Sequence, residues 1–120
     1  MDMRILIVED QLEAVRPLMM LLGVRGHETE VATTVAEALE VLDHHGAAHF
    51  SAILTDLQLP DGSGRQVAHA VGPHPCVVAV TGHVIALDSD EPFTHHLRKP
   101  VDFDALLSIL AEQESSDIDG

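Results

Sequence analysis

The sequence contains no tryptophan, no tyrosine and only three phenylalanines among its 120 residues. Single-stranded nucleic acids stack their bases on aromatic side chains, so the chain lacks the platforms for that binding. Basic residues are also scarce: six Lys and Arg stand against 20 Asp and Glu, which gives a formal net charge of −14. This charge repels the phosphates of nucleic acids and anionic lipids. We therefore expect protein partners and no direct binding to nucleic acid or membrane.

Cysteine and long apolar runs are the other absences. The single cysteine, Cys76, cannot form an intramolecular disulfide, and it adjoins an apolar run at residues 77–80, so we expect a buried thiol. No apolar run approaches the ~20 residues that cross a bilayer, and the start of the chain leads directly into a strand-like segment. We expect a cytoplasmic protein of one domain, which is the usual outcome at this length.

Short apolar runs alternate with amphipathic segments along the whole chain. The runs predict strands at residues 4–8, 29–32, 50–55, 76–80 and 95–98. Helical spacing of apolar residues predicts helices at 11–24, from 35 to about 44, around 65–71 and after residue 102. Strands that alternate with helices favour a parallel sheet with helices on both faces. The sequence thus predicts one doubly wound α/β domain over residues 1–114, followed by a flexible acidic tail at 115–120.

Residues that prefer helix starts support these boundaries. Asp10 is a candidate N-cap for the first helix, and Asp102 is one for the last. Thr34, followed three residues later by Glu37, has the form of a capping box.

Polar residues follow the predicted strands where each strand ends. Glu9 and Asp10 follow the first strand, Asp56 the third, Thr81 the fourth, and Lys99 the fifth. In open parallel sheets ligands collect outside the carboxyl ends of the strands, so we expect these side chains to meet in one cleft. Neighbouring carboxylates repel one another unless a cation compensates, which predicts a hard divalent metal, with Mg²⁺ the best fit. A carboxylate beside Mg²⁺ and a lysine is equipped to accept a phosphoryl group.

These motifs resemble the receiver domain of bacterial two-component response regulators from about Met3 to Ala111. The matching features are Ile-Leu-Ile-Val-Glu-Asp at the first strand end, Asp56-Leu-Gln-Leu-Pro followed by Gly64, Thr81-Gly, and Lys99-Pro. The resemblance implies a (βα)5 fold of the chemotaxis-receiver type, with flavodoxin-like strand order 2-1-3-4-5. The tail after Ala111 is too short for an effector domain, so we expect a stand-alone receiver.

The same resemblance implies a role for each site residue. Asp56 would accept the phosphoryl group, Asp10 would bind Mg²⁺ directly, Glu9 would act largely through water, and the backbone carbonyl of Gln58 would be another metal ligand. Thr81 and Lys99 would contact the phosphate. A cis peptide would precede Pro100, where the bond to proline makes it feasible.

The implied function is a signalling switch and not an enzyme. A histidine kinase or phosphotransfer protein would phosphorylate Asp56, and the switch would then alter contacts with an unknown downstream protein. A monomer or weak homodimer is expected.

Two features depart from the family pattern. The segment from Val84 to Leu97 is short, so we expect the fourth helix to be truncated or absent. His96 stands three positions before Lys99, where the family carries an aromatic switch residue. We therefore expect an altered output surface, although Thr81 and Pro100 keep their places in the switch.

Other functions remain open at this point. The chain could be a pseudo-receiver that binds proteins without phosphorylation. A phosphatase with an aspartyl nucleophile would need an acid where Gln58 stands, and a flavin protein would need aromatic residues that are missing. The histidines, including the pair His45 and His49, complete no recognised metal pattern, and we expect them to be solvated. The loop Gly62-Ser-Gly lacks the lysine of a P-loop.

Overall fold

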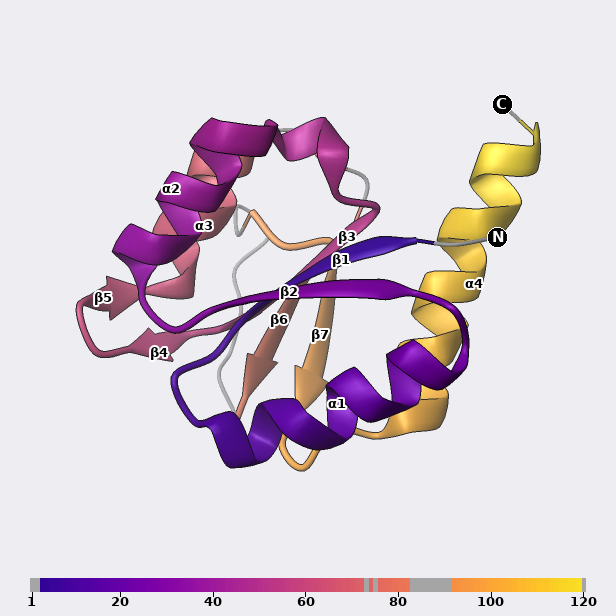
Figure 1. The fold of residues 1–120 in the computed structure, drawn as a ribbon, viewed down its shortest axis with the longest axis horizontal. Helices are drawn as coiled ribbons and strands as arrows, with labels where there is room; N and C mark the ends of the chain where they lie inside the picture. The colour runs from indigo at the N-terminus through magenta and orange to yellow at the C-terminus, as the bar shows by residue number, and fades with distance from the viewer. Residues whose placement is uncertain (1–2, 73, 75, 83–91, 120) are drawn as a thin grey trace.

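The structure, a computed structural model, describes residues 3–72, 74, 76–82 and 92–119. Five parallel strands form one sheet in the order β2-β1-β3-β6-β7 (Figure 1). They are β1 (Arg4–Val8), β2 (Glu28–Ala32), β3 (Ala52–Asp56), β6 (Val77–Thr81) and β7 (His95–Arg98). Counted along the sheet-forming strands, this is the predicted order 2-1-3-4-5, so the doubly wound α/β fold is confirmed.

Helices cover both faces of the sheet (Figure 1). One face carries α1 (Leu12–Val24) and α4 (Phe103–Asp119), and the other carries α2 (Val35–His45) and α3 (Gly64–Val71). A short 3-10 turn, η1 (Ala47–His49), precedes β3, and a hairpin of β4 (Gln58–Leu59) and β5 (Gly62–Ser63) follows it. Among the described residues no helix is long and apolar enough to cross a membrane.

The alternation of side chains along each strand explains why the inner strands are largely apolar. Ile5 and Ile7 of β1 enter the core beneath α1 and α4, whereas Leu6 and Val8 enter the core beneath α2. Every residue of β3 and β6 is buried. A strand covered on both faces favours apolar residues, and the polar exceptions Thr55, Asp56 and Thr81 lie at the carboxyl ends of β3 and β6.

The predicted helix starts are right in two cases and wrong in one. Asp102 Oδ1 accepts the backbone N–H of Asp104 at 3.0 Å, as expected of an N-cap. Thr34 Oγ1 accepts the N–H of Glu37 at 3.0 Å, which is half of the predicted capping box. The cap position of α1 is Gln11 and not Asp10, because the chain needs one more extended residue before it turns into the helix.

Two other expectations concern the second half of the chain. The last helix continues to Asp119, beyond Ser115, where the flexible tail was expected to begin. Residues 111–119 contain no glycine or proline, so their polarity alone does not stop the helix. The expected truncation or loss of the fourth helix concerns residues 83–91, which lie outside the described residues.

Candidate functional site

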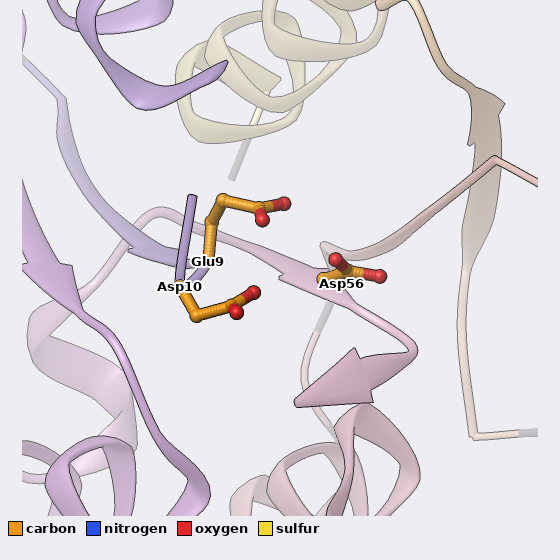
Figure 2. A group of neighbouring side chains, drawn as sticks. All are labelled: Glu9, Asp10 and Asp56. Atoms are coloured by element: carbon orange, nitrogen blue, oxygen red, sulfur yellow. The ribbon is translucent and has the colours of Figure 1, made fainter. Parts of the chain in front are cut away.

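Carboxylates from two neighbouring strands meet at the carboxyl edge of the sheet. Val8 pairs in register with Thr55, so the residues that follow β1 lie beside Asp56 at the end of β3. Figure 2 shows Glu9 and Asp10 extending from the end of β1 toward Asp56. One carboxylate oxygen from each of the three residues lies within 4.8 Å of the others. The structure therefore brings the three predicted acidic residues together.

Lys99 supplies positive charge to this cluster. Its Nζ lies 2.7 Å from Glu9 Oε2 and 2.9 Å from Asp56 Oδ2, so one ammonium group bridges two carboxylates. Glu9 and Asp56 are buried, with 5% and 8% of their surfaces exposed, whereas Asp10 is exposed. The two carboxylates that have least access to water are thus the ones that the lysine compensates.

The pKa values of this pair report the balance between burial and charge. Burial raises the pKa of Glu9 above its ordinary value, and the nearby Asp56 charge adds to this, although the hydrogen bonds from Lys99 and Gln11 oppose it. Partial burial lowers the pKa of Lys99, but its hydrogen bonds to Glu9 and Asp56 outweigh that effect and the pKa is raised. Lys99 is therefore firmly protonated, and the excess negative charge of the site lies on its carboxylates.

Backbone contacts hold Asp56 in place. The N–H of Gln58 donates to Asp56 Oδ1 at 3.1 Å, and the hydroxyl of Thr55 donates to the Asp56 carbonyl oxygen at 3.0 Å. Gly64, the first residue of α3, lies against the same carbonyl, since a Cβ at this position would collide with it and would lie 2.8 Å from Thr55 Oγ1. This positioning role was missed from the sequence, in which Gly64 was only a member of a motif. The sequence shows a glycine at the start of a helix, but it does not show which backbone atoms pack against that glycine.

Thr81 and Lys99 complete the cleft. Thr81 ends β6 and is 6% exposed, and its carbonyl accepts the backbone N–H of Lys99 at 2.8 Å. An open cleft of about 440 Å³ is lined by residues from four segments, namely Asp10, Gln11, Asp56, Gln58, Leu59, Pro60, Thr81, Gly82 and Lys99. The peptide between Lys99 and Pro100 is cis, as the resemblance implies.

The donor set of this cleft fits a hard divalent cation. Carboxylate oxygens are the ligands that Mg²⁺ prefers, and an exposed Asp10 beside a buried Asp56 leaves room for water ligands. Gln58 lines the cleft, and metal binding by its carbonyl stays a prediction. Within the described parts of the chain, no other group of three His, Cys, Asp or Glu residues is spaced to hold a metal.

The histidines near η1 contact one another at the surface, where His44 and His45 are exposed, as expected. The rings of His45 and His49 stack at a centroid distance of 4.5 Å, and His49 meets the buried ring of Phe50 edge-on at 5.0 Å. Cys76 is fully buried, as expected, and burial raises the pKa of its thiol to about 11. At neutral pH it is therefore an inert core residue.

His96 lies on β7, on the exposed side of the strand. Its ring meets the ring of Phe93 edge-on at 6.0 Å. Phe93 is buried in a small apolar cluster with Leu57 and Ala79, beneath α3. The contact between these two rings was not anticipated from the sequence.

Comparison with known proteins agrees with this geometry. Residues 5–111 match the family model described as the response regulator receiver domain. The chain belongs to this family. Among solved structures, it is similar to a CheY-like receiver domain from Methylobacillus flagellatus, with 28% identity and a TM-score of 0.80 over 94% of this chain and 99% of that one.

A second similar structure is the CheY-like receiver domain protein from Methanospirillum hungatei JF-1. It has 26% identity and a TM-score of 0.83, and the similarity covers 100% of both chains. A comparison with curated proteins finds no significant match. Receiver domains generally bind Mg²⁺ at an acidic pocket, and the acidic cluster of this receiver lies at the corresponding edge of the sheet.

Proposed function

We propose that this receiver domain is a phosphoacceptor switch in which Asp56 takes a phosphoryl group from a histidine kinase or a phosphotransfer protein. The observation that carries the proposal is the ion pair between Lys99 Nζ and Asp56 Oδ2, at 2.9 Å, inside a cluster of three carboxylates. A turn aspartate would need neither a bridging lysine nor two acidic neighbours. A site for phosphoryl transfer needs both, because charge develops on the transferred group.

Each residue then has one task. An oxygen of Asp56 forms the new bond to phosphorus while the bond between phosphorus and the donor's imidazole nitrogen breaks. Lys99 would move from Asp56 to a phosphate oxygen, and the buried hydroxyl of Thr81 would donate to another. Bound Mg²⁺, held by Asp10, Asp56 and the Gln58 carbonyl with Glu9 acting through water, would neutralise the charge of the phosphate oxygens.

The output in this proposal is a change in protein contacts, and the chain is not an enzyme that acts on an external substrate. The switch would pass through Thr81, His96 and Pro100 to an unknown downstream protein, and the receiver would work in the cytoplasm as a monomer or weak homodimer. The charge of −14 supports a protein partner over nucleic acid.

Intact-mass spectrometry after incubation with acetyl phosphate and Mg²⁺ tests the proposal. The wild type is expected to gain one phosphoryl group, and Asp56→Asn is expected to gain none. Asp104→Asn is the matched control, because this exposed aspartate lies outside the cleft. Chelation of Mg²⁺ should abolish the gain in wild type and control alike.

Other outcomes would redirect the interpretation. If the wild type gains nothing, even with a candidate kinase, a pseudo-receiver that binds partners without phosphorylation replaces the switch. Steady release of product from an external phosphoester would instead show an enzyme.

A further inference from the structure

A second cavity lies behind the acidic cluster, beneath α1 and the start of α4. Its volume is about 210 Å³, and apart from Glu9, Asp56 and Lys99 all of its lining residues are apolar. The floor is formed by the buried side chains of the inner strands, among them Ile7, Leu54 and Val80. Pro17 and Phe103, both exposed, mark the rim and show that the cavity reaches the surface.

The acidic cluster forms a wall between this cavity and the cleft described above. Asp56 and Lys99 line both spaces. On this wall Glu9 Oε1 already accepts the N–H of Gln11 at 3.1 Å, and Glu9 Oε2 lies 2.7 Å from Lys99 Nζ. No buried side-chain nitrogen or oxygen among the described residues lacks a hydrogen-bond partner. A ligand in the cavity therefore does not need to supply a hydrogen bond to the polar groups of the wall.

Small side chains create the space. Ala14 on α1 and Val101 before α4 both line the cavity, where larger side chains would fill it. An engineered apolar cavity of ~150 Å³ in another protein stays dry and binds benzene, so a cavity of this size and lining is able to hold a single ring.

We propose that this cavity is a binding site for a neutral apolar molecule of about the size of one aromatic ring. Apolar walls favour burial of apolar surface. The charged side chains of the wall already pair with one another, so they leave no hydrogen-bond partner for a polar ligand group. A charged ligand is disfavoured, since an anion meets Glu9, Asp56 and a net charge of −14, while the adjacent cation position is held by Lys99. Asp56 and Lys99 line this site, but the inference does not rest on the proposed function, because no step of phosphoryl transfer is needed for an apolar ring to bind.

Titration with toluene, followed by methyl NMR, tests the inference directly. We expect saturable shifts of the Leu18 and Val101 methyl groups, which line the cavity, and none at Leu39 on α2. The melting temperature should rise by roughly 5 °C when toluene is about tenfold above its Kd. Benzoate carries the same ring with a negative charge and should produce neither effect.

Filling the cavity should remove the binding. Ala14→Leu is expected to weaken toluene binding at least tenfold, whereas Ala70→Leu, the same change at an exposed position of α3, should leave it unchanged. If Ala14→Leu fails to fold, Val101→Phe fills the same space from the other side.

Three results would overturn the site. The first is the absence of any saturable shift at Leu18 and Val101 when toluene is added. If a phosphotransfer protein alone shifts these methyl groups, a partner side chain is the occupant and the small-molecule site is refuted. The second is toluene binding that persists unchanged in the folded filled variant. The third is benzoate that binds as tightly as toluene.

Discussion

The two edges of the sheet use polar residues in opposite ways. At the amino edge, His74 Nδ1 accepts the N–H of Cys76 at 3.0 Å, and its Nε2 lies 2.8 Å from the carbonyl of Phe50. Because Nδ1 is an acceptor here, Nε2 is the ring nitrogen that donates to the Phe50 carbonyl. His27 Nδ1 likewise accepts the N–H of Met3 at 3.3 Å. These histidines satisfy backbone groups where strands begin.

At the carboxyl edge the side chains also pair with one another. Lys99 bridges Glu9 and Asp56, and Asp10 stays exposed beside them. The cluster holds three carboxylates and one ammonium group, so it keeps a surplus of negative charge that a metal ion can bind. The difference teaches that a polar side chain whose hydrogen bonds all go to backbone marks structure, whereas side chains that also compensate one another's charge mark a site.

The largest test of this contrast is Lys99→Met. Removing the ammonium leaves the buried carboxylates of Glu9 and Asp56 facing each other, and we expect the free energy of unfolding to fall by about 2 kcal/mol. The rate of phosphoryl transfer from acetyl phosphate should fall ~100-fold. Urea unfolding and intact-mass kinetics measure the two effects.

Mg²⁺ provides the control for that variant. Because the cation replaces the missing positive charge, added Mg²⁺ should stabilise Lys99→Met more than the wild type. Equal stabilisation of both proteins would mean that the lysine and the metal do not share the same carboxylates.

Gly64→Ala tests whether Asp56 is held by the approach of α3. The new Cβ would collide with the Asp56 carbonyl oxygen, so β3 or α3 must shift, and we expect a loss of about 2 kcal/mol in stability together with slower phosphorylation. Gly23→Ala is the matched control. Gly23 lies within α1 and a Cβ there meets nothing within 4 Å, so this change should raise the free energy of unfolding by roughly 0.5–1 kcal/mol. Thermal unfolding that ranks the two variants in the reverse order would refute the contact.

His74→Ala probes the amino edge. Loss of its bonds to Cys76 and Phe50 should lower the free energy of unfolding by about 1 kcal/mol, while the phosphorylation rate stays that of the wild type. His69→Ala, at an exposed site on α3, should change stability by less than ~0.5 kcal/mol. If His74→Ala is phosphorylated more slowly than the wild type, the amino edge is not purely structural and the contrast between the two edges is wrong.

The smallest effect is expected at Asp61, where its carboxylate accepts the N–H groups of Val35 at 2.8 Å and Ala36 at 3.0 Å. These two bonds lower the pKa of Asp61 below its ordinary value of 3.8. Because the folded pKa is the lower one, the charged group stabilises the fold above pH 3.8, and this contribution is lost as the pH falls through the folded pKa.

Asp61→Asn should therefore be less stable than the wild type at pH 7, and the gap should close below pH 3.8. Glu40→Gln removes an exposed carboxylate from the middle of α2 and should show no such pH-dependent gap. Denaturant midpoints measured across this pH range decide the matter, and a gap that stays constant with pH would argue against the helix-start contact.

Much of the fold and of the candidate site could be predicted, because both follow from periodicity. Strands buried on both faces are largely apolar, so the end of each run is visible, and Glu9, Asp10 and Asp56 stand at the ends of two of those runs. Local caps were less predictable. Asp10 is a good cap by type, yet Gln11 takes the position, since residue preference does not determine where the chain turns.

Contacts across long sequence separations were not predictable. Asp61 caps a helix that begins 26 residues earlier, and Phe93 fills a space beneath α3. Neither position carries a periodic signal, because the partner comes from a different element.

The sequence by itself determined how strands and helices alternate along the chain and which residue follows each strand, because hydrophobic burial imposes a period on the chain. Only the tertiary structure decided how the charges are compensated and where space remains. Lys99 reaches Asp56 across 43 residues of sequence, and Ala14 and Val101 leave a cavity on the other side of that ion pair. Distances between side chains depend on how helices pack on the sheet, and that packing is set by residues that are far apart in the sequence.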